Sequence, residues 1–170
     1  TTVAASLPAL DARGEGAAGR FVGPLRPRPL GPWTSPWTAD DVRPLILASF
    51  STGRAWDQTS RILRTQSALN GLDVRGLFTT GGGYGEGADN CVFVDHAPHE
   101  AVLGEAAAVV THAGHGTLLA ALSAGVPVVC LPNPGADQIA LAARAQALGA
   151  GIALAGDRAS PGQIRAAVAA

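Results

Sequence analysis

The segment His112–Thr117 combines residue types that favour the binding of an anion. Its two glycines and one alanine would let backbone amides approach a ligand closely, and its threonine adds a hydroxyl group. A helix is predicted to follow this segment, and the first N–H groups of a helix lack partners and carry the positive end of its dipole. The combination favours a phosphate or diphosphate, to which His112 could donate a further hydrogen bond. Glycines also occur simply because a turn is tight, so the local pattern leaves both interpretations open.

Two other loops are candidates for the same kind of site. Ser49–Gly53 and Asp95–His99 each follow an apolar, strand-like run of residues. In an open α/β sheet, ligands bind at the carboxyl ends of the strands, in loops that lead into helices. All three loops therefore qualify as parts of a ligand site.

The four histidines form two pairs of equal spacing, His96 with His99 and His112 with His115. Both pairs fall in predicted turns, where this spacing does not give the side chains a common direction. No cysteine or carboxylate cluster lies near them in the sequence to complete a tetrahedral zinc site. We therefore expect no metal and no cofactor. Solvent-exposed histidine is as good an interpretation of His99 and His115 as ligand contact.

Two common enzyme signatures are missing from the sequence. There is no Gly-x-Ser-x-Gly of the kind that serine hydrolases use, and no Gly-x-Gly-x-x-Gly follows the first predicted strand. The stretch Gly81–Gly87 has no helix to open, so we interpret it as a surface loop.

From Leu45 onward, short apolar runs alternate with stretches of helical periodicity. The predicted strands are Leu45–Phe50, Val74–Thr79, Val92–Val94, Ala107–Thr111, Val126–Leu131 and, at an edge, Ile152–Leu154. The predicted helices are 55–69, 118–123, 138–148 and one that begins after Ser160. Strands that are apolar throughout and separated by helices indicate a parallel sheet covered on both faces. The fold class is therefore α/β, a Rossmann-like parallel sheet with helices on both faces.

Local signals mark the ends of these helices. Asp137 could cap the helix 138–148, and Gly149 supplies its C-terminal stop. The sequence Ser-Pro-Gly-Gln at 160–163 is typical of a capping box with proline at the first helical position. The helix 55–69 is expected to pack through a face formed by Trp56, Thr59, Ile62, Leu63 and Leu69.

Composition excludes several classes of protein. The net charge is −1, whereas DNA binding needs a basic face, so we expect no nucleic-acid partner. No apolar run is long enough to span a bilayer and the N-terminus lacks a signal pattern, so we expect no membrane partner and a cytoplasmic location. Cys91 and Cys130 lie beside strand-like runs and are interpreted as buried, reduced thiols, although a disulfide is possible in principle.

Residues 1–42 differ in character from the rest of the chain. Proline and glycine crowd the stretch 20–32, where they remove backbone donors and block helix formation. We expect residues 1–42 to contain the end of a missing N-terminal domain and the inter-domain linker that follows it. Residues 43–170 are then the ligand-binding domain.

An ordered set of residues resembles the signature of the GT1-type glycosyltransferases with the GT-B fold, in particular the bacterial enzymes that act on antibiotics and other natural products. The family pattern is His-Gly-Gly-x-Gly-Thr, followed by Gly-Val-Pro, Pro and Asp-Gln at set distances. The matching residues are His112, Gly114, Gly116, Thr117, Gly125-Val126-Pro127, Pro132 and Asp137-Gln138. Asp95–Leu103 is similar to the family's Trp-x-Pro-Gln turn, and Phe21–Pro24 to its inter-domain linker.

The resemblance implies that residues 43–170 bind a nucleotide sugar, a dTDP- or UDP-sugar. The acceptor, a small molecule, and the catalytic base would then belong to the missing N-terminal acceptor domain, so no catalytic residue is expected here. The transfer would be inverting and metal-independent. The implied diphosphate-binding residues are His112, Gly114, Gly116, Thr117, Ser51 and Thr52. The implied base-binding residues are His96, Ala97, Pro98 and His99, and the implied sugar-binding residues are Asp137 and Gln138.

Four positions depart from the family pattern. His96 stands in place of a stacking tryptophan and His99 in place of a glutamine. Ala113 stands in place of a second glycine, and Ala120 in place of a glutamate that binds ribose in many members. The last departure favours a dTDP-deoxysugar donor over a UDP-sugar. An epimerase-like relative and a non-catalytic nucleotide-sugar-binding subunit remain alternatives, and a homodimer is a further expectation.

Overall fold

A six-stranded parallel sheet forms the centre of the molecule. The computed structural model describes residues 3–11, 19–24, 31–50, 56–82, 87–88, 90–134 and 136–170. Along the sheet the strand order is β5-β4-β3-β6-β7-β8. The strands are β3 (Leu45–Ser49), β4 (Arg75–Thr79), β5 (Cys91–Val94), β6 (Ala106–Thr111), β7 (Val128–Cys130) and β8 (Gly151–Ala153). This is the strand order of the classic doubly wound nucleotide-binding sheet, so the predicted α/β class is confirmed.

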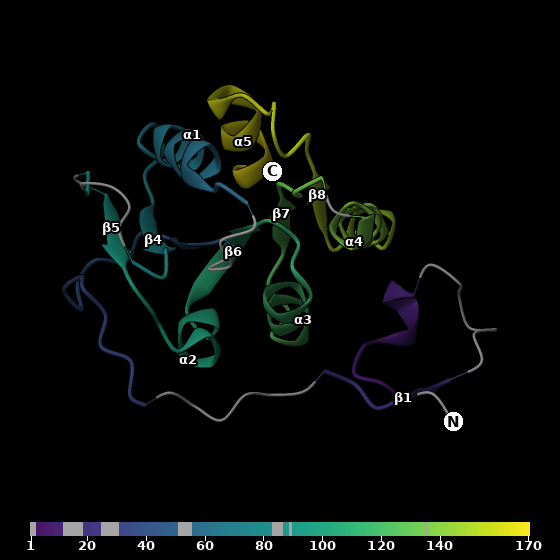
Figure 1. Cartoon of the computed structure of the whole chain (residues 1–170). Coiled ribbons are helices and arrows are strands. Elements are labelled where there is room, and N and C mark those ends of the chain that lie inside the picture. The colour runs from purple at the N-terminus through teal and green to yellow at the C-terminus, as the bar shows by residue number, and fades with distance from the viewer. Residues whose placement is uncertain are drawn as a thin grey trace.

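Helices cover both faces of the sheet (Figure 1). On one face lie α1 (Thr59–Leu69) and α5 (Pro161–Val168), which contact each other. On the other face lie α2 (His99–Leu103), α3 (His115–Ser123) and α4 (Ala136–Ala147). The connections from β3 and from β6 run in opposite directions along the sheet. Because crossovers between parallel strands are right-handed, the two directions place their helices on opposite faces.

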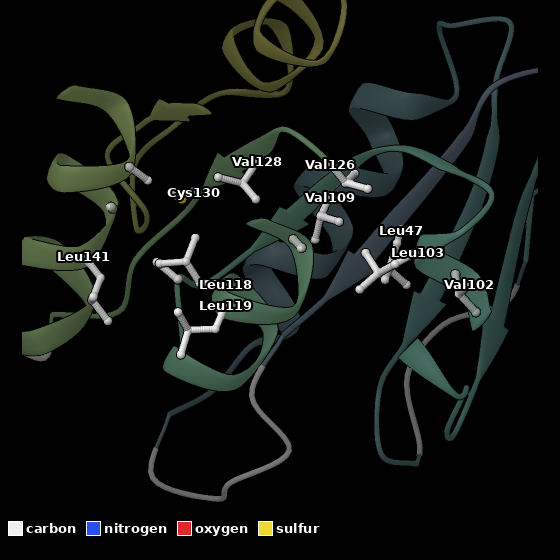
Figure 2. Packing of buried hydrophobic residues seen from close by; sticks show 14 of the residues in the cluster. Leu47, Val102, Leu103, Val109, Leu118, Leu119, Val126, Val128, Cys130 and Leu141 are labelled. Carbon is white, nitrogen blue, oxygen red and sulfur yellow. The ribbon is translucent and has the colours of Figure 1, made fainter. Parts of the chain in front are cut away.

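Each face of the sheet has its own hydrophobic core, because side chains alternate between the faces along every strand. In β3, Leu47 packs toward α2, α3 and α4, whereas Ile46 packs toward α1 and α5. Figure 2 shows the first of these cores, with Leu118 and Leu119 of α3 on the side of this helix that faces Leu141 of α4. The two cysteines are free and lie on opposite faces, with Cys130 in the first core and Cys91 in the second. The sheet therefore separates the two thiols, and they cannot form a disulfide with each other.

The predicted stop and start signals at the C-terminal end of the chain are present. Gly149 has φ +69°, the left-handed conformation that ends a helix. Ser160 forms both halves of the capping box: its hydroxyl accepts from the Gln163 N–H, and its own N–H donates to the Gln163 side chain. The predicted cap at Asp137 is wrong, because α4 begins at Ala136 and Asp137 lies inside its first turn.

The predicted packing face of the first helix needs a correction. The helix begins only at Thr59, because the Asp57 carboxylate accepts a hydrogen bond from the Thr59 N–H at 2.9 Å, so Trp56 precedes it. Trp56 is 42% exposed and Leu63 is 51% exposed. The residues that α1 buries are Arg61, Ile62, Thr65, Ala68 and Leu69. Two polar side chains that the predicted face did not include, Arg61 and Thr65, thus lie inside.

Part of the segment predicted to be a linker packs against the domain. β1 (Val3–Ala4) pairs with β2 (Arg20–Phe21), and the short helix η1 (Pro8–Leu10) contacts α4. Leu10 is buried in the first core, and the Ser6 hydroxyl lies 3.1 Å from Nε2 of His115 at the start of α3. The division at residues 42 and 43 stays a prediction. None of the helices in the described part of the chain is long and apolar enough to cross a membrane.

Candidate nucleotide-sugar site

The centre of the sheet contains the position at which ligands bind in doubly wound folds. β3 and β6 are neighbours, and the connections that leave them run in opposite directions along the sheet. Such a switch point opens a crevice at the carboxyl ends of the two strands. Here those ends carry Ser49 and Thr111, which are register partners. The loops after β3 and β6 therefore begin side by side.

The loop after β6 leads directly into the N-terminus of α3. Gly114 is the N-cap residue, and α3 begins at His115, three residues earlier than predicted. No side chain caps this helix end, so its first N–H groups remain available to an anion. A β-carbon added to Gly116 would meet no atom within 4 Å. Open space therefore lies above the helix end at Gly116, with the half-buried Thr117 beside it.

His112 is held at the entrance to this helix. Only 8% of the residue is exposed. Burial is the main cause that lowers the pKa of His112, and the Ser49 backbone partly opposes this shift. The ring is therefore neutral at neutral pH and carries one N–H. Its Nδ1 is buried and has no hydrogen-bond partner among the described residues, which is rare for a buried polar atom and calls for a ligand or water.

Gly114 is required by the position of the His112 ring. A β-carbon at Gly114 would overlap Nε2 and Cε1 of His112. The residue between them, Ala113, has φ +62° and is fully buried. A residue with a side chain costs about 1–2 kcal/mol in this left-handed conformation. The tight turn that glycine would form more easily is thus made here by an alanine.

The loop after β5 reaches the same crevice through α2. His99 is the first residue of α2, and its Nε2 lies 3.3 Å from the Ser49 hydroxyl oxygen. Thr79 at the end of β4 donates to the same oxygen at 2.9 Å. Burial is the main cause that lowers the pKa of His99. The ends of β3, β4 and the β5 loop are therefore joined by side-chain contacts.

The other residues predicted to bind the base differ in their surroundings. His96 is exposed, and Pro98 is the half-buried N-cap of α2. Ala97 is 6% exposed and its side chain belongs to the first hydrophobic core. Ala97 could therefore meet a ligand only through its backbone.

The two residues predicted to bind the sugar lie at the start of α4. Asp137 is exposed. Gln138 is half-buried, and its Oε1 accepts a hydrogen bond from the Asn133 N–H at 3.0 Å. Asn133 in turn accepts from Nε2 of Gln58 at 3.1 Å, in a fully buried contact. The amide oxygen of Gln138 is thus occupied, and its NH₂ group is the part left for a ligand.

Sequence reasoning did not find Gln58 and Asn133. Gln58 is 3% exposed and Asn133 is fully buried. In the part of the chain that the structure describes, Oε1 of Gln58 and Nδ2 of Asn133 have no hydrogen-bond partner. The sequence position of Asn133 could have indicated a role in the site, because this residue lies between a predicted strand and the Asp137-Gln138 pair. Ser51 and Thr52 lie outside the described residues. Among the residues that the structure describes, no three His, Cys, Asp or Glu side chains form a group that could hold a metal ion.

Comparison with known proteins gives consistent matches. Residues 82–170 match the family described as "Erythromycin biosynthesis protein CIII-like, C-terminal domain". Demethyllactenocin mycarosyltransferase of Streptomyces fradiae is 33% identical over 121 residues, which cover 66% of this chain and 25% of that protein.

Solved structures show the same similarity. The structure of the glycotransferase of kitacinnamycin aligns with 98% of this chain and 45% of its own, at 25% identity and a TM-score of 0.83. The glycosyltransferase VinC in complex with DTDP aligns with 98% of this chain and 42% of its own, at 26% identity and a TM-score of 0.72. The chain thus spans about a quarter of its curated relative and less than half of either solved structure.

Proposed function

The chain belongs to the erythromycin biosynthesis protein CIII-like C-terminal domain family, and from this premise we propose that it binds the nucleotide-sugar donor of a glycosyltransferase. The donor is a dTDP- or UDP-sugar, and the acceptor is a small natural product bound by another domain. The transfer is inverting and metal-independent. The DTDP in the VinC complex supports a nucleoside diphosphate as the ligand class.

One observation carries the proposal: a buried, neutral histidine with a free Nδ1 stands beside an uncapped helix N-terminus. Nδ1 of His112 and the first N–H groups of α3 are polar groups to which no described residue forms a side-chain hydrogen bond. Negative charge develops on the diphosphate as the bond to the sugar breaks. Donors already fixed in place stabilise such a leaving group without reorganisation. His112, Gly114, Gly116 and Thr117 are therefore assigned to the diphosphate.

The remaining predicted residues are assigned around this loop. Ser51 and Thr52, in the loop after β3, contribute hydroxyl groups to the diphosphate. The segment from His96 to His99 contacts the base, with Ala97 acting through its backbone. Asp137 and the NH₂ group of Gln138 bind sugar hydroxyls, which the bond from Asn133 to Gln138 Oε1 supports.

Titration calorimetry with this chain tests the proposal. We expect UDP and dTDP to bind, uridine and thymidine to bind more weakly, and no sugar to be transferred by this chain alone. The nucleosides serve as controls, because they share the base and ribose but lack the anion. Absence of heat from both diphosphates at millimolar concentration would overturn the proposal.

Substitution of Gly116 by alanine should separate binding from stability. The added methyl group meets no protein atom, so the free energy of unfolding should be unchanged or rise by up to about 1 kcal/mol, since alanine favours helix. The same methyl group enters the space proposed for the diphosphate, so UDP affinity should fall at least about tenfold, equivalent to roughly 1.4 kcal/mol.

Gly162→Ala is the matched control. Gly162 is also the second residue of its helix, α5, and its nearest neighbour would be the Ser160 hydroxyl at 3.8 Å. Chemical denaturation should give similar stabilities for the two variants, whereas calorimetry should detect lost UDP binding in Gly116→Ala alone. Equal UDP affinities in the two variants would contradict the placement of the diphosphate at Gly116.

A further inference from the structure

A buried arginine lies next to the proposed site, without an acidic partner among the described residues. Arg61, in the first turn of α1, is only 6% exposed. Its Nε donates to the Leu131 carbonyl and its Nη2 to the Pro132 carbonyl, each at 3.2 Å. Among the described residues, no carboxylate lies within ion-pair distance of it. Buried charges in proteins are normally paired, because removal of a charge from water is costly.

Two acidic side chains act on Arg61, each by less than burial does. Burial is the main cause that lowers the pKa of Arg61, followed by repulsion from Arg64. Asp157 and Asp57 oppose this shift from a distance, but they do not outweigh it. The surroundings of Arg61 therefore disfavour its positive charge, and the attraction of Asp157 and Asp57 does not compensate for the effect of burial.

Backbone contacts connect Arg61 to the anion loop. Leu131, whose carbonyl accepts from Arg61, donates its own N–H to the Thr111 carbonyl at 2.7 Å. Thr111 ends β6 and immediately precedes His112. The positive charge also acts on the His112 ring, where it adds to the effect of burial in lowering the pKa. The unpaired cation thus lies behind the loop that is proposed to bind the diphosphate, on the α1 side of the sheet.

We propose that the counter-ion of Arg61 is the diphosphate of the bound donor. The guanidinium keeps its hydrogen bonds to the Leu131 and Pro132 carbonyls and attracts the diphosphate electrostatically, without direct contact. The site therefore favours a nucleoside diphosphate over a monophosphate or an uncharged nucleoside. Burial is the main cause that lowers the pKa of His112, and the charge of Arg61 adds to it. This inference rests on the proposed function, since it needs an anion in the crevice.

An alternative role for Arg61 is purely structural, because its two hydrogen bonds tie α1 to the end of β7. Arg64 provides a matched control for that role. It lies one turn later on α1, and its guanidinium also donates to carbonyls of another segment, those of Ala159 and Gly156. Loss of Arg64 therefore removes one positive charge and two inter-element hydrogen bonds, but not next to His112.

The test compares Arg61→Gln, Arg61→Lys and Arg64→Gln by calorimetric titration with UDP, UMP and uridine. At a separation of several ångströms and an intermediate dielectric, loss of one positive charge should weaken UDP binding roughly tenfold, and UMP binding less. Uridine binding should not change in any variant. Arg61→Lys keeps the charge and should stay within about threefold of the unsubstituted chain, and Arg64→Gln should match that chain for all three ligands.

Nuclear magnetic resonance of the unsubstituted chain gives a second measurement that does not depend on variant folding. The Nε–Hε signal of Arg61 should shift on addition of UDP and stay in place with uridine. If the chain binds UDP but this signal does not move, or Arg61→Gln and Arg64→Gln bind UDP equally, the counter-ion role is overturned while donor binding stands. If the unsubstituted chain binds no UDP, both proposals fall.

Discussion

Replacement of His112 by alanine is expected to weaken UDP and dTDP binding about tenfold to a hundredfold, while uridine and thymidine bind nearly as before. A hydrogen bond to a charged group contributes about 1.5–3 kcal/mol, which corresponds to this range of affinity. The ring is buried, and its Nδ1 has no hydrogen-bond partner among the described residues, so the substitution removes a group that is free to meet the ligand. Calorimetric titration with diphosphate and nucleoside in parallel measures the difference directly.

His115→Ala is the control for this substitution. His115 is three residues further on, is exposed, and contacts the Ser6 hydroxyl rather than the crevice. It should leave the affinity for UDP unchanged. Equal losses of diphosphate and nucleoside affinity in His112→Ala would reject a phosphate contact and indicate a general collapse of the site.

Gly114→Ala is expected to weaken diphosphate binding mainly by displacing the His112 ring. The added β-carbon would overlap Nε2 and Cε1 of His112, so the ring must leave its position. Overpacking of this kind also destabilises a fold by typically 1–3 kcal/mol. Affinity for UDP should fall as far as in His112→Ala, and the free energy of unfolding should fall as well, which denaturant titration measures.

A double-mutant cycle shows whether Gly114 acts through His112. If it does, the variant with both substitutions should bind UDP no more weakly than His112→Ala alone, because the displaced ring is already absent. Losses that simply add would mean that the two residues contact the diphosphate independently.

The sheet could be predicted because its strands are short apolar runs with clear boundaries. All six predicted strands are present, with ends that differ by one or two residues. β7 is shorter than predicted and begins at Val128, because Pro127 has no N–H to donate. The resemblance to antibiotic glycosyltransferases is also confirmed, and it rested on ordered residue matches rather than on periodicity.

Helix starts were harder to predict, because polar and small residues carry no apolar period. α3 begins at His115, although its apolar pattern starts only at Leu118. The helix that contains Asp137 likewise begins before it, at Ala136. In both helices the wrongly predicted start involves residues that are assigned to the ligand. Because α3 begins at His115, its free N–H groups are those of residues 115–117.

The buried polar residues around the site could not be predicted from a single sequence. Gln58 and Asn133 are far apart in the chain and meet only because α1 and the end of β7 are adjacent in space. Arg61 occupies a position that a helical pattern would assign to solvent, yet it is buried against two carbonyls of the β7 end. The predicted loops supplied the rim of the crevice, whereas its inner wall comes from contacts between distant elements.

The two cysteines on opposite faces of the sheet form an internal pair of reporters. Burial raises the pKa of Cys91 to about 11 and that of Cys130 to about 12, and only a thiolate reacts readily with an alkylating reagent. Neither sulfur should therefore be labelled at neutral pH until its own helix layer opens. The alkylation rates of the two thiols would therefore report separately on the opening of the helices on each face of the sheet. A bound nucleotide should lower the alkylation rate of the thiol that lies under the helices it stabilises.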